Sequence, residues 1–168
     1  KDLATHDLDL TAWVADSPYA SVSASTKNSS GREHEDFVTV SGQLNNGVIV
    51  NHLVNWMSPY KERKTVVTGE NGALVAETVL SDLTYYKNGV DRIEWDQISN
   101  FRGVSEGEVT RYAIKKPEPL AVEHRNFREA ILNDTPSIAT FADGLRTMRV
   151  VEAVLESAKS NSVVNVED

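Results

Sequence analysis

The chain contains 168 residues, among them 17 basic and 25 acidic ones and no cysteine, and its formal net charge is −8. The length suits a single domain covering residues 1–168 and is sufficient to bury a hydrophobic core. The acidic balance argues against a surface for nucleic acid or an anionic membrane, and no run of about 18 apolar residues indicates a membrane span. The lack of cysteine argues against disulfides and thiolate metal sites and fits a cytoplasmic location.

The first predicted element is a helix from residue 2 to about residue 16, and it carries a polar stripe. Asp2, His6 and Asp9 follow at intervals of four and three residues, which places them within about 60° of one another around a helix. A histidine beside a carboxylate can accept a proton from a hydroxyl group while the carboxylate stabilises the imidazolium that forms. The same residues also fit an ordinary amphipathic helix with an acidic first turn. Spacing alone leaves both interpretations open.

A series of strands is predicted after Ser17-Pro18, where the hydrophobic period changes from helical to alternating. Turn signals of the Asn-Gly type at residues 46–47, 71–72 and 88–89 predict antiparallel connections between consecutive strands. The expected strands cover residues 19–26, 37–44, 48–56, 64–68, 73–80, 83–87 and 108–114.

The last third of the chain is predicted to be mainly helical. One helix is expected over residues 119–133, a second one after a cap at Thr140, and a short strand over residues 163–166. This order indicates an α+β fold, in which helices pack on one face of an open, mostly antiparallel sheet. The strand at residues 48–56 has apolar groups on both faces, so we expect the other sheet face to lie in an oligomer interface.

Three segments of the chain resemble the C-terminal domain of the Gfo/Idh/MocA oxidoreductases, the superfamily of glucose-fructose oxidoreductase and inositol dehydrogenase. They are the opening DLATHDLD, the central run NWMSPYKERKTVVTGENGALVAET and the tail from EPLAVEHRNF onward. Within the tail, Phe127, the turn at Pro136 and the pair Asp143-Gly144 follow in the family's order. The resemblance covers nearly the entire chain.

The resemblance implies that this chain is one part of a larger enzyme. Members of the family combine an N-terminal Rossmann domain, which binds NAD or NADP, with a C-terminal domain for substrate binding and oligomerisation. The sequence lacks both a GxGxxG fingerprint and the family's Glu-Lys-Pro motif, and it begins at Lys1 without Met. We therefore expect a fragment that is inactive alone. The intact protein would oxidise a secondary hydroxyl of a sugar, polyol or nucleotide sugar, as a homodimer or homotetramer.

The resemblance also assigns roles to individual residues. His6 would act as the general base or hydrogen-bond partner of the reacting hydroxyl, and Asp2 would orient His6 or the substrate. Asp9 matches a third family position and would bind another hydroxyl. Arg63 could meet a substrate phosphate, because a guanidinium matches two phosphate oxygens; the alternative is a solvated loop.

Two alternatives belong to other functional classes. The oxygen and nitrogen donors of Asp2, His6 and Asp9 could hold a divalent metal ion, although a further ligand would be needed from elsewhere. The domain could also serve only for assembly, with no catalytic role for its first helix.

Overall fold

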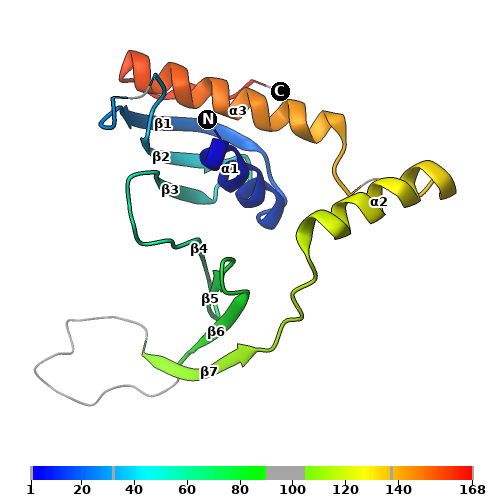
Figure 1. The fold of residues 1–168 in the computed structure, drawn as a ribbon. Coiled ribbons are helices and arrows are strands. Elements are labelled where there is room, and N and C mark those ends of the chain that lie inside the picture. Colours follow the sequence, from blue (N-terminus) through cyan, green and yellow to red (C-terminus); the bar gives the residue numbers. More distant parts are fainter. Residues whose placement is uncertain (1, 32, 90–104, 137, 168) are drawn as a thin grey trace, which may run out of the picture. The chain divides into compact units, whose positions relative to one another are not determined.

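A computed structural model describes residues 2–31, 33–89, 105–136 and 138–167. They form an α+β fold, as the sequence predicts (Figure 1). The chain divides into two compact units, one made of residues 1–58 and 126–168 and the other of residues 59–125. The elements, in order, are α1 (Asp2–Val14), β1 (Tyr19–Lys27), β2 (Phe37–Leu44), β3 (Ile49–Asn55), β4 (Lys64–Gly69), β5 (Gly72–Glu77), β6 (Asp82–Asn88), β7 (Glu106–Tyr112), α2 (Pro119–Asn133), α3 (Phe141–Ser160) and β8 (Val164–Asn165). The assignment of all 168 residues to one domain stays a prediction.

The first unit contains a four-stranded antiparallel sheet with the order β3-β2-β1-β8. Val22 on β1 lies opposite Gly42 on β2, which lies opposite Val50 on β3, and these positions alternate with residues of the other face. The helices α1 and α3 lie on one face of this sheet (Figure 1). That face therefore becomes the interior of the unit.

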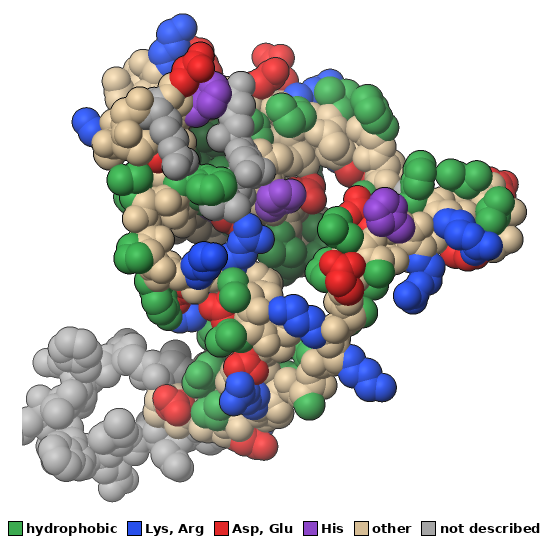
Figure 2. All heavy atoms as spheres, viewed as in Figure 1, with side chains coloured by type: hydrophobic (Ala, Val, Ile, Leu, Met, Phe, Trp, Pro, Cys, Tyr) green, Lys and Arg blue, Asp and Glu red, His purple; other side chains and the backbone are tan. Residues whose placement is uncertain are grey.

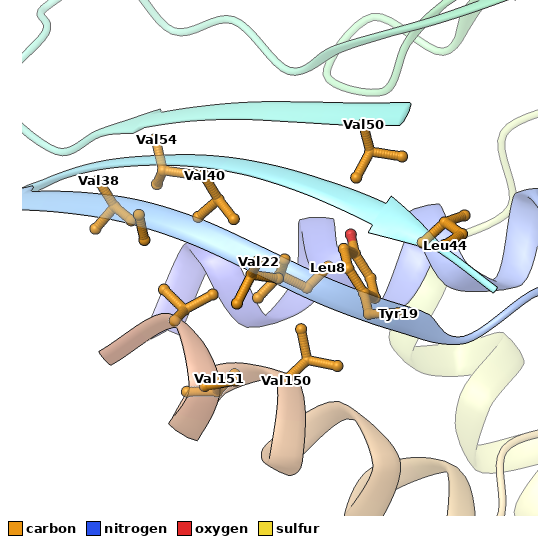
Figure 3. Packing of buried hydrophobic residues seen from close by; sticks show 13 residues of the cluster. Leu8, Tyr19, Val22, Val38, Val40, Leu44, Val50, Val54, Val150 and Val151 are labelled. Carbon is orange, nitrogen blue, oxygen red and sulfur yellow. The ribbon is translucent and has the colours of Figure 1, made fainter. Parts of the chain in front are cut away.

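The core of the first unit is aliphatic. Leu8 from α1 and Val150 and Val151 from α3 point toward the valines of the sheet (Figure 3). Leu8 and Val40 each expose only 2% of their surface. Burial of one such side chain stabilises a fold by about 1.5–3 kcal/mol. Packing against this core fixes the rotation of α1 and thus determines which of its residues face outward.

The opposite face of this sheet is mixed in character. Ile49 and Leu53 on the edge strand β3 are 75% and 69% exposed. On the same face of β1, Ser23 and Ser25 are polar and also exposed. The edge strand β3 therefore carries apolar residues on both of its faces. The oligomer interface expected there stays a prediction.

The helix α3 has defined ends and a polar attachment to the sheet. Thr140 caps its N-terminus in a reciprocal capping box with Asp143, and Asn161 ends it in the left-handed conformation. The fully buried Ser157 accepts a hydrogen bond from the amide of Ala24 at 2.9 Å and donates one to the carbonyl of Ser162 at 2.6 Å. The bond from Ala24 holds the second half of α3 to β1, and the bond to Ser162 joins the helix to the turn that follows it.

The second unit contains another four-stranded antiparallel sheet, with the order β4-β5-β6-β7. The sequence predicts one sheet, whereas the described strands form two.

The helix α2 contains no buried residue, and Figure 2 shows hydrophobic and charged side chains next to each other on its surface. No helix among the described residues is long and apolar enough to cross a membrane.

Candidate functional site

The helix α1 turns its predicted catalytic residue away from the sheet. Leu8 is buried, and Ala4 and Ala12 pack against the same core, whereas His6 is exposed. Because two residues correspond to about 200° of helix rotation, His6 lies about 160° from Leu8 around the axis. The imidazole can therefore reach a ligand on the outer side of α1. Asp2 begins α1, but its side chain lies outside the described part of the structure.

Asp9, the third residue of the predicted stripe, connects α1 to α3. Its carboxylate oxygen Oδ1 accepts a hydrogen bond from the hydroxyl of Thr147 at 2.7 Å. The same hydroxyl is 3.1 Å from the backbone carbonyl of Asp143, one helical turn earlier in α3. One oxygen of Asp9 is thus fixed by this contact. The side chain is exposed, so it is also accessible to a ligand.

A groove runs beside Asp9 between α1 and the beginning of α3. Its volume is about 730 Å³, within the usual range for small-molecule sites. The walls combine apolar and aromatic side chains with carboxylates and guanidinium groups. Trp13 on α1 contributes to one wall and is 74% exposed, and Tyr19 lies at the base of the same region. This groove is a cavity that the sequence did not predict.

A partly buried polar pair lies beneath α1. The hydroxyl of Tyr19 on β1 is 2.8 Å from Nε2 of His52 on β3. Burial raises the pKa of Tyr19 far above its usual value, against a hydrogen bond with Thr11 and with a smaller contribution from the charge of Asp7. Burial lowers the pKa of His52, and the charge of Asp7 opposes this shift. The pair is therefore uncharged at neutral pH.

The contact between Tyr19 and His52 crosses β2, the strand that lies between β1 and β3. The ring of Tyr19 lies over Gly42 on β2, where a Cβ atom would be 3.2 Å from two ring carbons. Sequence reasoning missed this contact. A tyrosine at the start of one strand and a glycine in the next are the only local signals for it, and neither identifies His52 as the partner.

Arg63, the fourth predicted residue, belongs to the second unit. Its backbone carbonyl accepts a hydrogen bond from the amide of Thr78 at 3.0 Å, and its backbone amide is 3.4 Å from Oε1 of Glu77. The residue is exposed. Its guanidinium makes no ion pair with any residue in the described ranges. The roles of Asp2, His6, Asp9 and Arg63 stay predictions.

Two kinds of bound group, a metal ion and a dinucleotide, require particular arrangements of residues. The described residues include no cluster of three or more His, Cys, Asp or Glu side chains that could hold a metal ion. Both sheets are antiparallel, whereas a dinucleotide-binding fold is built from parallel βαβ units. The described strands therefore form no parallel βαβ unit.

Comparison with protein families gives one match of nearly full length. Residues 1–166 match the model of the C-terminal alpha/beta domain of an oxidoreductase family, GFO_IDH_MocA. The sequences of curated proteins give no match.

Solved structures give the same fold at low sequence identity. UDP-N-acetylglucosamine 3-dehydrogenase GnnA from Acidithiobacillus ferrooxidans is 21% identical with a TM-score of 0.79, over 95% of this chain and 48% of that chain. A levoglucosan dehydrogenase in complex with NADH and levoglucosan is 18% identical with a TM-score of 0.79, over 99% and 50%. The WlbA dehydrogenase from Bordetella pertussis, in complex with NADH and UDP-GlcNAcA, is 19% identical with a TM-score of 0.68, over 98% and 44%. The chain thus spans about half the length of these proteins.

Proposed function

Because the chain belongs to the Gfo/Idh/MocA oxidoreductases as their C-terminal α/β domain, we propose that it is the substrate-binding and assembly part of an NAD(P)-dependent dehydrogenase. The complete enzyme oxidises a secondary hydroxyl of a sugar, polyol or nucleotide sugar. The observation that carries this proposal is the exposure of His6 on the outer side of α1, beside the groove that Asp9 lines. The neighbours described as acting on UDP-N-acetylglucosamine and levoglucosan support the substrate class.

Each predicted residue has a role in this proposal. His6 accepts the proton of the reacting hydroxyl, and Asp2, one helical turn earlier, orients the imidazole or the substrate. Asp9 binds a second hydroxyl with the carboxylate oxygen that Thr147 leaves free. Arg63 is assigned to an anionic group of the substrate, if the substrate is a nucleotide sugar.

The cofactor belongs to the rest of the enzyme. NAD or NADP would be bound by a nucleotide-binding half outside this chain, because the described residues have no parallel βαβ unit. This chain alone is therefore proposed to be inactive. Assembly into a homodimer or homotetramer would cover Ile49 and Leu53 on the open sheet face. A cytoplasmic location, suggested by the lack of cysteine, is part of the same proposal.

The test uses the longer enzyme, that is, the complete protein that contains this chain and the nucleotide-binding half. Its variants are compared in a hydride-transfer assay with sugars, polyols and nucleotide sugars. His6→Gln should lower kcat by about 10²–10⁴-fold, the usual contribution of a general base. His34→Gln changes an exposed histidine in the loop between β1 and β2 and should leave kcat unaltered. Unchanged turnover in His6→Gln would contradict the role of His6.

The assembly part of the proposal has its own measurement. Light scattering should give the mass of a dimer or tetramer, and that mass should not change in His6→Gln. A monomeric mass at micromolar concentration would refute the assembly role.

A further inference from the structure

The groove beside α1 continues the stripe on which His6 lies. Trp13 is seven residues after His6, which returns it to nearly the same side of the helix, about 10 Å further along the axis. Asp9 stands between them, one turn from either residue, and both Asp9 and Trp13 line the groove. A ligand that reaches from His6 to Trp13 along this stripe must therefore be longer than one sugar ring.

The charge in the groove disfavours an anionic ligand. Four carboxylates line it, those of Asp9, Asp16, Asp143 and Glu167, together with the guanidinium groups of Arg146 and Arg149. Arg146 forms an ion pair with Asp143, which leaves three carboxylates and one guanidinium. Repulsion between like charges disfavours the binding of a ligand that has the same charge as the site. A diphosphate placed here would meet a net negative surface.

The remaining chemistry of the groove suits uncharged hydroxyl groups. Asp9 and Asp16 are exposed acceptors for sugar hydroxyls, and Asp9 is held in place by Thr147 at 2.7 Å. The exposed ring of Trp13 offers a flat apolar surface, against which the C–H face of a pyranose ring can pack. Apolar surface beside polar groups that fix the orientation of a ligand is the usual composition of a small-molecule site.

We propose that the groove between α1 and α3 binds the second ring of a neutral glycoside, so that the substrate is an uncharged disaccharide or longer glycoside and no nucleotide sugar. This inference rests on the proposed function, because it assumes that the reacting hydroxyl lies at His6. The second ring packs on Trp13 and donates hydroxyl hydrogen bonds to Asp9 and Asp16. Arg63 then has no phosphate to bind.

The main test measures kcat/KM of the longer enzyme for glucose, UDP-glucose and a panel of neutral disaccharides (cellobiose, maltose, lactose and trehalose). At least one disaccharide should exceed both other substrates by about tenfold or more. Trp13→Ala should lower kcat/KM for that disaccharide by about tenfold and for glucose by less than about twofold. Trp56→Ala is the matched control, since Trp56 is also exposed, at 50%, but does not line the groove.

Two results would overturn the inference. One is a preference for UDP-glucose over every disaccharide, and the other is an equal loss for glucose and disaccharide in Trp13→Ala. Asp16→Lys provides a test by charge: the added cation should improve relative activity with UDP-glucose and impair it with the disaccharide.

A binding measurement separates this inference from the proposed function. In the longer protein, the indole resonance of Trp13 should shift on titration with the disaccharides and stay constant with UDP-glucose. If no sugar is oxidised but this shift occurs, the proposed function fails and the groove site stands. If sugars are oxidised without the shift, the function stands and the groove site is refuted.

Discussion

The hydroxyl of Tyr19 lies 2.8 Å from Nε2 of His52, and the tyrosine ring crosses β2 at Gly42 to reach it. This contact joins β1 to β3 beneath α1, in the interior of the first unit. It uses two titratable side chains that burial keeps uncharged at neutral pH. The consequences are measurable in the stability of the chain.

The half-buried His52 predicts a loss of stability in mild acid. Burial lowers the pKa of His52 in the folded chain, while the unfolded chain takes up the proton at the usual pKa of about 6.5. The unfolded state thus binds more protons as the pH falls, and the free energy of unfolding should decrease below about pH 6.5. Urea unfolding at a series of pH values measures this slope.

Substitution identifies the group responsible. His52→Gln should flatten the pH dependence just below about pH 6.5, whereas His34→Gln should retain it. Asp36 and Asp143 have lowered pKa values in the folded chain because of hydrogen bonds, first of all from Ser30 and Thr140. Their contribution is lost only below about pH 4, so it does not overlap the histidine range. An unchanged slope in His52→Gln would contradict this assignment.

Two glycine substitutions should have opposite effects. In Gly42→Ala, the new Cβ would lie 3.1 Å from the carbonyl oxygen of Ser21 and 3.2 Å from ring carbons of Tyr19. We expect the free energy of unfolding to fall by about 1–3 kcal/mol, as for other overpacked sites. A Cβ atom added at Gly144 in α3 would have no neighbour within 4 Å among the described residues, so Gly144→Ala should stabilise the helix by up to about 1 kcal/mol. Thermal unfolding of both variants decides between these signs.

A comparable pair exists among the serines of α3. Ser157 is fully buried with two hydrogen bonds, one to Ala24 and one to Ser162. Ser157→Ala leaves the amide of Ala24 without its acceptor and should cost about 1–3 kcal/mol. Ser160 is exposed, so Ser160→Ala should change stability by less than about 0.5 kcal/mol. Equal losses in chemical denaturation would show that the buried contact has no special weight.

The link between α1 and α3 can be isolated by a double-mutant cycle. Thr147→Val removes the hydroxyl that donates to Asp9 and that also lies 3.1 Å from the carbonyl of Asp143, so the loss of stability in the single variant overstates the energy of the Asp9–Thr147 contact. Combined with Asp9→Ala, the cycle should give a coupling energy of about 0.5–1.5 kcal/mol between the two side chains. A coupling near zero would mean that this contact does not hold the helices together.

The sequence predicts the elements of this fold well because their signals are local. The strand Phe37–Leu44 is found with its predicted bounds, since it lies between a polar loop and the Asn46-Gly47 turn. The division into two sheets could not be predicted in the same way. The pairing of strands before and after the segment that begins at Trp56 depends on the path of the chain. Alternation within a strand carries no information about its neighbours.

The candidate site shows the same limit. The outward placement of His6 follows from the 3.6-residue period once Leu8 is known to be buried. The contact between Asp9 and Thr147 joins residues far apart in sequence, and no local pattern indicates it. The groove beside them exists only because α1 and α3 pack on the same sheet face, so it could not be anticipated from either helix alone.

The order of the strands in the first sheet has a consequence for synthesis on the ribosome. β1 lies between β2, which follows it directly, and β8, and just after β8 the amide of Val166 donates to the carbonyl of Ala20 at 2.9 Å. The core beneath β1 also needs α3. The described strands of the second unit are continuous in sequence and can pair as they emerge. The first unit must instead wait until α3 and β8 have been made, and its half-formed sheet stays exposed to other nascent chains until then.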